Sequence, residues 1–514
     1  MDRLTTEEAE RELYNTLFQL RQTVLHEGLA LFRVWQPDIE RPAFCFSALN
    51  LAFYLAIRSH DLQALQEQLL PLGLSSLGRS EARTIYNLDA VMASLGRICH
   101  KRGKALIPYP SPKQFFLGNR LLQHNANLLF GRSPDGRYTK IMVTMPEEAA
   151  GNYALVRGLV AAGMDVVRIN CAHDDRDVWE KILQNVHRAE KELGRRCRIY
   201  MDLGGPKVRI AQVLVPGDDA KVYTGDTLFL VRKKISDYPK AYKGNVVLAC
   251  SIPQVFDTLC VGDPVLVDDG KLRCVVTDIV PQGAYLRVLG TREKGFNMKN
   301  RKSLNFPQTP LNLSPLTKQD LQDLDFILKH ADAVGYSFVR NRDDMRLLQN
   351  EIRKRSAGRQ RSIAIIAKIE TRDSVRNLPE IIVQAASHNP FGVMIARGDL
   401  AVEAGYYRLA ELQEEILWIC EAAHLPVIWA TQVLENLLKT GIPSRAEITD
   451  AAMGGRAECV MLNKGPYVVK GVSCLADILA RMTRHQFKKS PQLQALHMAQ
   501  ETVRHYVVDE PPEP

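Results

Sequence analysis

The segment SIAIIAKIE, residues 362–370, places a lysine and a glutamate at the end of a strand-like run. Side chains alternate along a strand, so Lys368 and Glu370 share one face and the aliphatic residues around them fill the other. A lysine that points into a protein interior is costly without a partner. Two interpretations stay open: an internal ion pair between Lys368 and Glu370, or a site that a ligand or a metal ion completes.

Asp399, in the segment ARGDL, follows the next strand-like run and offers a second carboxylate. Neighbouring strands lie about 4.8 Å apart, so carboxylates at the ends of two of them can share one cation. Two carboxylates with open positions suit Mg²⁺ or Mn²⁺, and no histidine or cysteine residues have the spacing of zinc ligands. Gly398 falls at the strand-to-helix turn of the same segment, where backbone N–H groups can bind a carboxylate or a phosphate.

Polar residues end most of the other strand-like runs as well. Any one of them alone is more often a cap or a surface group, but several that meet at one edge indicate a site. The full set is Arg168, Asn170, Asp202, Ser337, Lys368, Glu370, Asp399 and Thr431.

Eight short apolar runs, nearly all followed by a helix-like stretch, must position these residues. In chain order they are KIMVTM, MDVVRIN, RIYMDL, ADAVGYSF, IAIIAKIE, FGVMIA, PVIWAT and CVMLN. Units of this kind predict an α/β protein with a parallel (β/α)₈ TIM barrel, whose strand ends meet at one mouth. An open Rossmann-like sheet is the alternative, although no GxGxxG fingerprint follows any of the runs.

A different pattern interrupts the barrel after the third run. Turn signals such as Asp269-Gly270 separate stretches rich in β-forming residues, which predicts a small all-β inserted domain. An insertion at the mouth would lie over the site and act as a lid. The predicted divisions are an N-terminal helical extension (1–138), the first part of the barrel (139–210), the lid domain (211–304), the second part of the barrel (305–486) and a C-terminal tail (487–514).

The composition of the 514 residues is that of a globular protein too long for one compact core. The longest apolar stretch, residues 43–57, is too short and too polar to span a bilayer, which predicts no membrane partner. A net charge of +9 without basic runs interleaved with aromatics argues against nucleic acid and is compatible with small phosphorylated anions. Ten cysteines without a CxxC pair suggest reduced thiols and a cytoplasmic location.

Motifs spread over about residues 139–481 resemble those of one family, in the same order. They are TKIMVT, GMDVVRINCAH, MDLGGPKVRI, VDDG, SLNFP, SFVR, AKIE, ARGDL, ATQVLE and PSRAE, and the family is pyruvate kinase. The resemblance implies phosphoryl transfer from phosphoenolpyruvate to ADP, which yields pyruvate and ATP and depends on Mg²⁺ or Mn²⁺.

The resemblance assigns a role to each matching residue. At the reacting groups it places Lys368, Thr431 and Arg168. As magnesium ligands it places Glu370 and Asp399. It also assigns a set of residues to substrate and nucleotide binding. These are Arg168, His173, Arg209, Lys302 (with Lys294 as the alternative), Ala396, Arg397, Gly398 and Thr431. To the monovalent-cation site or its substitute it assigns Asn170, Asp202 and Lys207.

Several positions depart from the family's pattern. Ala172 and Leu203 replace a serine and a threonine of the potassium site, and NKGP, residues 463–466, replaces the SGET motif of proton delivery. Members that need K⁺ carry glutamate at the position of Lys207, whereas members that do not need it carry lysine. The resemblance therefore implies activity without K⁺, with a solvated loop lysine as the alternative for Lys207. The family's C-terminal domain has no counterpart, which favours a homodimer over a tetramer.

Two other functions stay open at this point. One is a Mg²⁺-dependent lyase or aldolase that acts on phosphoenolpyruvate or pyruvate on the same barrel. The other is a pseudoenzyme that binds phosphoenolpyruvate or nucleotide without catalysis, as the changes at Ala172 and Asn463 permit. The predicted lid and Arg209 favour the kinase over the lyase, and the intact metal ligands and lysine favour it over the pseudoenzyme.

Overall fold

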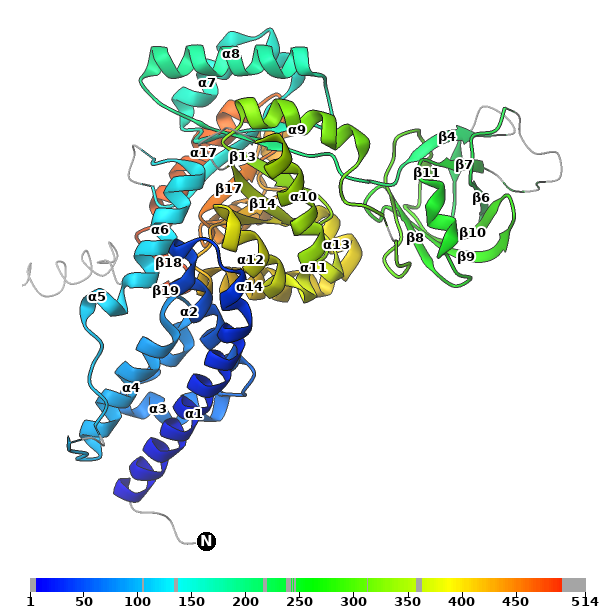
Figure 1. Cartoon of the computed structure of the whole chain (residues 1–514). Helices are drawn as coiled ribbons and strands as arrows, with labels where there is room; N and C mark the ends of the chain where they lie inside the picture. Colours follow the sequence, from blue (N-terminus) through cyan, green and yellow to red (C-terminus); the bar gives the residue numbers. More distant parts are fainter. Residues whose placement is uncertain are drawn as a thin grey trace, which may run out of the picture.

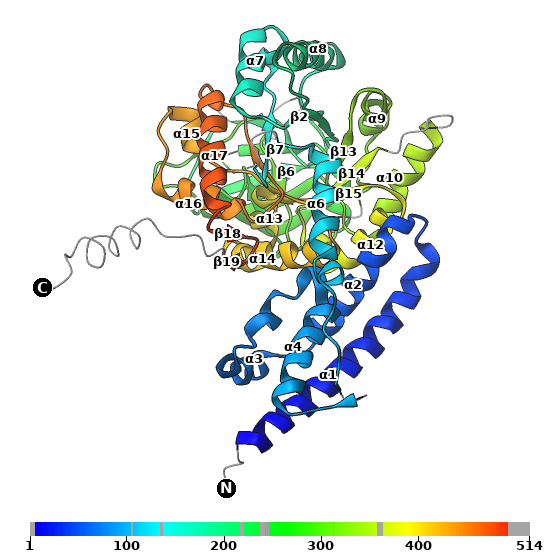
Figure 2. The same cartoon turned by 90° about the vertical axis from the view of Figure 1, so that its left-hand side faces the viewer.

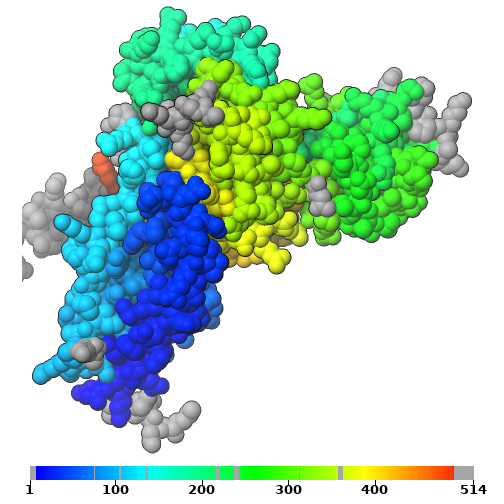
Figure 3. Space-filling model, in the orientation of Figure 1, coloured from blue at the N-terminus to red at the C-terminus, as the bar shows by residue number. Residues whose placement is uncertain are grey.

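The computed structural model describes residues 6–103, 106–133, 137–215, 220–236, 242, 244, 246–311, 313–356 and 363–491. A central barrel carries an all-β lid domain on one side and a bundle of N-terminal helices below it (Figures 1 and 3). The lid domain and the helical bundle lie on different sides of the barrel, so the two attachments contact it independently.

Eight parallel strands close the barrel in the order β1-β17-β16-β15-β14-β13-β3-β2. Their bounds are β1 (Lys140–Thr144), β2 (Val166–Asn170), β3 (Arg198–Asp202), β13 (Ala333–Tyr336), β14 (Ala364–Ile369), β15 (Phe391–Ala396), β16 (Val427–Ala430) and β17 (Cys459–Leu462). The predicted TIM barrel is confirmed, and the open Rossmann-like sheet is wrong because these strands form a closed ring.

The alternation of side chains along β14 gives the barrel its two apolar layers. Ala364 and Ile366 belong to the core inside the ring, whereas Ile365 and Ile369 belong to the core between the strands and the outer helices. The outer helices are α7 (Tyr153–Ala162), α8 (Arg176–Leu193), α9 (Lys318–His330), α10 (Arg342–Arg355), α11 (Arg372–Arg376), α12 (Leu378–His388), α13 (Arg397–Ala404), α14 (Tyr406–Ala422), α15 (Glu435–Thr440), α16 (Arg445–Gly454) and α17 (Val468–Met482). Strands buried on both faces in this way need the continuous apolar runs seen in the sequence.

The lid domain leaves the barrel after β3 and returns before α9 (Figure 1). Its main sheet has seven strands in the order β12-β8-β9-β10-β6-β7-β4, and its apolar core is separate from that of the barrel. The chain turns between β8 and β9 through Asp268, Asp269 and Gly270, which all have positive φ angles. The strands are β4 (Ile210–Leu214), β5 (Lys221–Val222), β6 (Thr227–Val231), β7 (Val246–Cys250), β8 (Pro264–Val267), β9 (Leu272–Val280), β10 (Gly283–Gly290), β11 (Phe296–Asn297) and β12 (Leu304–Asn305).

The N-terminal segment is helical, as predicted: its helix α2 packs against α12 and α14, and α6 lies across the end of the barrel (Figure 2). Its α-helices are α1 (Thr6–Trp35), α2 (Pro42–Arg58), α3 (Gln63–Leu69), α4 (Thr84–Ile98), α5 (Pro112–Phe115) and α6 (Leu117–Phe130). Leu129 and Phe130, at the end of α6, belong to the core inside the barrel. The fully buried ring of His424 contacts the Ser47 hydroxyl at 2.8 Å and the Ala82 carbonyl at 3.0 Å, and so joins the barrel to the helices.

The predicted C-terminal tail begins in a short hairpin, β18 (Gln486–Phe487) and β19 (Ser490–Pro491), and residues 492–514 lie outside the described part of the chain. Lys488 pairs with Glu458 of the barrel, and Lys489 pairs with Glu81 of the helical segment. The hairpin therefore holds both parts by ion pairs. Across the described residues, every helix is too short or too polar to cross a membrane.

Candidate active site

A cavity of about 410 Å³ lies at the C-terminal ends of the barrel strands. Most of the residues predicted from the sequence line it, namely Arg168, Asn170, His173, Lys207, Arg209, Lys368, Glu370, Ala396, Asp399 and Thr431. The remaining predicted residues, Asp202, Lys302, Arg397 and Gly398, are near its wall without lining it. The expected convergence of polar strand ends therefore takes place at one mouth.

Lys368 lies between two carboxylates. Its Nζ is 2.8 Å from Glu370 Oε1 and 3.5 Å from Asp202 Oδ2. It also donates a hydrogen bond of 2.9 Å to Ser337 Oγ. Burial lowers the pKa of Lys368, but the two carboxylates outweigh burial and raise the pKa above its ordinary value. The ion pair considered from the sequence is present, and its ammonium faces the cavity as a fixed positive charge.

Asp202 is almost fully buried at the end of β3 and orients Arg168 of the neighbouring strand β2. Arg168 Nη2 donates to Asp202 Oδ2 at 2.5 Å, and Nη1 donates to Thr144 Oγ1 at 2.9 Å. The Tyr200 hydroxyl donates to the other oxygen of Asp202 at 3.1 Å. Burial raises the pKa of Asp202, but Lys368 and Arg168 outweigh it and hold the pKa below the usual range. The group is therefore a charged anchor for two cations.

Thr144 and Tyr200 were not identified from the sequence. Thr144 is the last residue of β1, so the strand-end criterion that selected its neighbours could have found it. Tyr200 lies inside the ring, two residues before Asp202, where strand alternation places it on the same face. Both residues support the charged groups by hydrogen bonds.

Glu370 and Asp399 are close enough to influence one another. Burial is the main cause that raises the pKa of Glu370, the Lys368 ammonium lowers it, and the charge of Asp399 raises it further. The Phe338 N–H donates to Glu370 Oε2 at 2.7 Å and fixes the carboxylate. Among the described residues, no group of three or more histidine, cysteine, aspartate or glutamate side chains could hold a metal ion. A donor set of two carboxylates fits Mg²⁺ or Mn²⁺ shared with an oxygen-rich substrate, and does not fit zinc.

Lys207 lies against Asp399. Its Nζ donates to Asp399 Oδ1 at 2.7 Å, and both side chains are largely shielded, with 24% and 18% of their surface exposed. Lys207 belongs to the connection between β3 and the lid domain, whereas Asp399 is in the first turn of α13. The ammonium predicted to serve a monovalent-cation site thus contacts a predicted magnesium ligand.

The first turn of α13 also fixes Thr431, which follows β16. The Gly398 N–H donates to Thr431 Oγ1 at 2.9 Å, and Arg397 donates to the carbonyl oxygens of Ala430 and Thr431 at 2.8 and 2.5 Å. Arg397 in turn pairs with Asp450 at 2.5 Å. Thr431 has a φ of 66°, a left-handed conformation that costs energy for a residue with a side chain. Arg397 and Gly398 therefore act on the position of Thr431.

The lid side of the cavity carries further predicted residues. Arg209 lines the cavity and donates to the Arg301 carbonyl at 3.0 Å, while Lys302 pairs with Asp268 at 2.8 Å. Lys294 is exposed. His173 also lines the cavity, and burial, followed by the charges of Lys464 and Arg209, lowers its pKa.

The lid domain touches the barrel through Tyr406, a contact not expected from the sequence. The Tyr406 hydroxyl donates to the Asp269 carbonyl at 3.1 Å, and Asp269 lines the cavity. Tyr406 opens helix α14, so a rigid barrel element supports the turn between β8 and β9.

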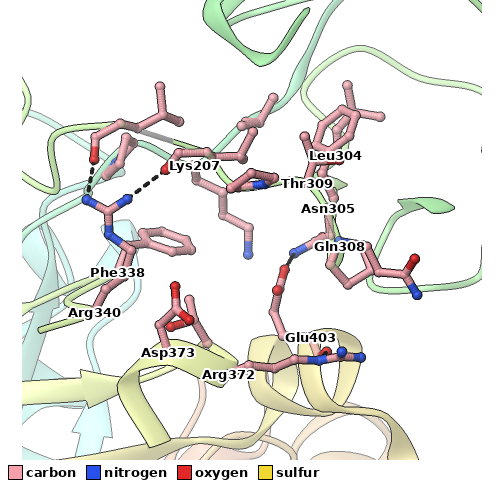
Figure 4. A pocket seen from close by; sticks show the side chains of 18 residues that line it. Lys207, Leu304, Asn305, Gln308, Thr309, Phe338, Arg340, Arg372, Asp373 and Glu403 are labelled. Atoms are coloured by element: carbon pink, nitrogen blue, oxygen red, sulfur yellow. Dashed lines mark hydrogen bonds between the residues drawn. The ribbon is translucent and has the colours of Figure 1, made fainter. Parts of the chain in front are cut away.

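A second cavity, of about 280 Å³, lies between the lid connections and the barrel loops and is called the hinge cavity below (Figure 4). Lys207 lines both cavities. Burial raises the pKa of Glu403, which lines the hinge cavity, to about 7. Asn305 Nδ2 donates to Glu403 Oε1 at 3.5 Å, and the buried Oδ1 of Asn305 has no hydrogen-bond partner within the described structure.

Comparisons with known proteins agree on one family. The family model described as "Pyruvate kinase, barrel domain" matches residues 136–471. Pyruvate kinase 2 of Synechocystis is 30% identical over 367 residues, which are 70% of this chain and 59% of that protein. Pyruvate kinase of Methylorubrum extorquens is 32% identical over 355 residues, 68% of this chain and 69% of that protein. A crystal structure of a pyruvate kinase from Cryptosporidium parvum superimposes with a TM-score of 0.60 and 29% identity, covering 69% of this chain and 72% of that one.

Proposed function

Because this chain belongs to the pyruvate kinase family, we propose that it transfers the phosphoryl group of phosphoenolpyruvate to ADP and forms pyruvate and ATP. The observation that carries the proposal is the mouth of the barrel. There, Arg168, Lys368 and Glu370 at the strand ends and Asp399 in the first turn of α13 line one cavity. Phosphoryl transfer requires this kind of arrangement, because catalysis depends on positioning and on positive charge around the phosphoryl oxygens.

In this proposal Arg168 and Lys368 hold the phosphoryl oxygens. Both cations are fixed by Asp202, and Lys368 is also held by Ser337, so neither side chain needs to reorganise when charge develops. Thr431 lies beside the carbon that receives the proton. Its Oγ accepts the Gly398 N–H, which directs the hydroxyl proton away from α13.

We propose Glu370 and Asp399 as the ligands of Mg²⁺ or Mn²⁺. When bound, the cation would supply positive charge to the transferring phosphoryl group. Glu370 is positioned for this role by the Phe338 N–H and Lys368, and Asp399 by the first turn of α13.

We also propose that activity does not require K⁺. Asp202 already has two cationic partners, Arg168 and Lys368, and the Lys207 ammonium adds a further positive charge at the cavity wall. Asn170 lines the same part of the cavity, and its Oδ1 accepts the Ala172 N–H at 3.2 Å.

For the nucleotide, the proposal uses Arg209 and His173 at the cavity wall, Ala396 at the end of β15, and a lysine of the lid, either Lys302 or Lys294. Arg397 and Gly398 serve the site through Thr431.

A cytoplasmic location is consistent with ten free cysteines. The homodimer remains a separate prediction that light scattering can test.

The decisive experiment measures pyruvate formation from phosphoenolpyruvate with and without ADP in the presence of Mg²⁺, with the Lys368→Met variant as the control. The proposal expects ADP-dependent pyruvate that the variant does not form. ADP-independent turnover would instead indicate a lyase. Tight binding of phosphoenolpyruvate without turnover would indicate a pseudoenzyme, and either result overturns the proposed kinase.

A further inference from the structure

The ion pair between Lys207 and Asp399 differs from the other ion pairs of the mouth in the elements that supply its two residues. Lys368 and Glu370 belong to one barrel strand and its end, and Arg168 and Asp202 belong to two neighbouring strands. Lys207, in contrast, belongs to the connection to the lid domain and reaches Asp399 across the cavity wall. A flexible lysine stem carries this cation, so it can be displaced without any movement of the barrel.

Lys207 shares the hinge cavity with a second carboxylate. Figure 4 shows its side chain pointing into the hinge cavity, which Glu403 lines from the barrel side. Glu403 is shielded from solvent, and its carboxylate forms no ion pair among the described residues. The nearby Arg372 guanidinium donates instead to the Glu403 backbone carbonyl at 2.6 Å, and its charge acts on the carboxylate only as a minor influence after burial. Asp202, by comparison, already holds two cations. Of these two carboxylates, Glu403 is therefore the one without an ion-pair partner, and it shares a cavity with Lys207.

We propose that Lys207 is an internal competitor for the divalent cation at Asp399, and that Glu403 receives its ammonium when the cation binds. The proposal rests on the proposed function insofar as Asp399 is a metal ligand. It assigns Lys207 a positioning and regulating role at the metal site and links metal binding to the hinge of the lid, because Glu403 contacts Asn305 at the end of β12.

The experiment is titration of the full-length protein with Mn²⁺ at pH 8, without substrate, with the affinity read from free Mn²⁺ by electron paramagnetic resonance. Lys207→Met should bind Mn²⁺ about 5- to 50-fold more tightly than the wild type, since a competing charge is removed. The matched control is Lys464→Met, which removes a cation from the same cavity without breaking a contact to Asp399. If both substitutions changed the Mn²⁺ affinity equally, the proposal that Lys207 competes for Asp399 would be wrong.

The role of Glu403 is tested by a double-mutant cycle. Glu403→Gln should weaken Mn²⁺ binding in the wild type and have a smaller effect in the Lys207→Met background, where no ammonium is displaced. Equal weakening in both backgrounds would contradict the receiving role. Unfolding midpoints of all variants establish that each one folds.

Failure of the inference and failure of the proposed function give different results. If Asp399→Asn does not weaken Mn²⁺ binding, Asp399 is not a ligand and the inference is wrong, while the pyruvate assay still decides the function. If the cycle behaves as expected but no ADP-dependent pyruvate forms, the metal site is as proposed and the kinase is not.

Discussion

The mouth and the base of the barrel both bury charged side chains, but they arrange them differently. At the mouth, Lys368 and Glu370 pair within one strand end and line a cavity of about 410 Å³. At the base, Glu458 is fully buried at the start of β17 and pairs with Lys488 of the C-terminal hairpin. The Glu458 carboxylate also accepts hydrogen bonds from the Val427 N–H and the Tyr138 hydroxyl, at 2.8 and 3.2 Å.

Burial of charge does not by itself identify a functional site. The base joins separate parts of the chain, since Lys488 and Lys489 of the hairpin pair with the barrel and with the helical segment. The charges at the mouth are oriented by similar bonds, but they share one open space. We therefore expect charge removal to cost activity at the mouth and stability at the base.

The largest effect is expected from Glu370→Gln at the mouth. The loss of a proposed metal ligand should lower kcat by about 1000-fold or more. Lys368 keeps Asp202 and Ser337 as partners, and burial raises the pKa of Glu370, so the unfolding midpoint should fall less than it does for removal of a buried counter-charge at the base. Parallel measurements of steady-state kinetics and urea unfolding check both parts. A variant that is strongly destabilised but active when folded would show that the Glu370 charge serves stability rather than activity.

Glu458→Gln at the base should have the opposite signature. It leaves Lys488, which is 5% exposed, buried without its counter-charge, and should cost about 3–5 kcal/mol of unfolding free energy. The activity of the molecules that remain folded should be unchanged, as measured at low temperature after separation of aggregates. Adding Lys488→Met should restore part of the stability, because the buried ammonium that lost its ion-pair partner is then absent. Absence of any restoration would show that the ion pair is not the cause.

Much of the mouth could be predicted from the sequence because strand periodicity is local. The alternation in residues 362–370 directed Lys368 and Glu370 inward, and the placement of Ile366 in the core inside the ring confirms the direction. The fold followed from the same patterns, since eight apolar runs with intervening helices have few arrangements that bury every strand on both faces.

The contacts that remained unpredicted join segments far apart in the chain. Lys207 and Asp399 are 192 residues apart, and Tyr406 and Asp269 are 137 apart. Their meeting depends on where the lid domain sits, which no local pattern encodes. The same holds at the base, where helical periodicity indicated an apolar face on the N-terminal helices but not that His424 would meet Ser47.

A smaller and pH-dependent change in stability is expected when Glu403, which lies between the mouth and the lid domain, is replaced. Burial raises its pKa in the folded protein from 4.5 to about 7. The stability that the protonated group contributes is present below the unfolded pKa and is lost as the pH rises toward 7. At pH 8 the Glu403→Gln variant should therefore be more stable than the wild type by up to about 3 kcal/mol, and the gain should shrink toward pH 5.

Urea unfolding of both proteins at pH 5, 6.5 and 8 measures this dependence. A Glu403→Gln variant that is less stable than the wild type at pH 8 would show that a cation stabilises the charged carboxylate in solution. In that case the charge of Glu403 would stabilise the fold, as the charge of Glu458 does at the base.

The smallest effect is expected from the monovalent cation. Replacing Na⁺ by K⁺ at constant ionic strength should leave the rate of pyruvate formation unchanged. Asp202, the carboxylate that would otherwise attract K⁺, is 1% exposed and already contacts Arg168 and Lys368. A third cation would meet repulsion from both and would have to lose its hydration in a buried site. A many-fold rise in the rate with K⁺ would mean that the fixed cations at the mouth do not complete the site. The carboxylates of the mouth would then need a cation from solution, whereas Glu458 at the base is paired within the chain.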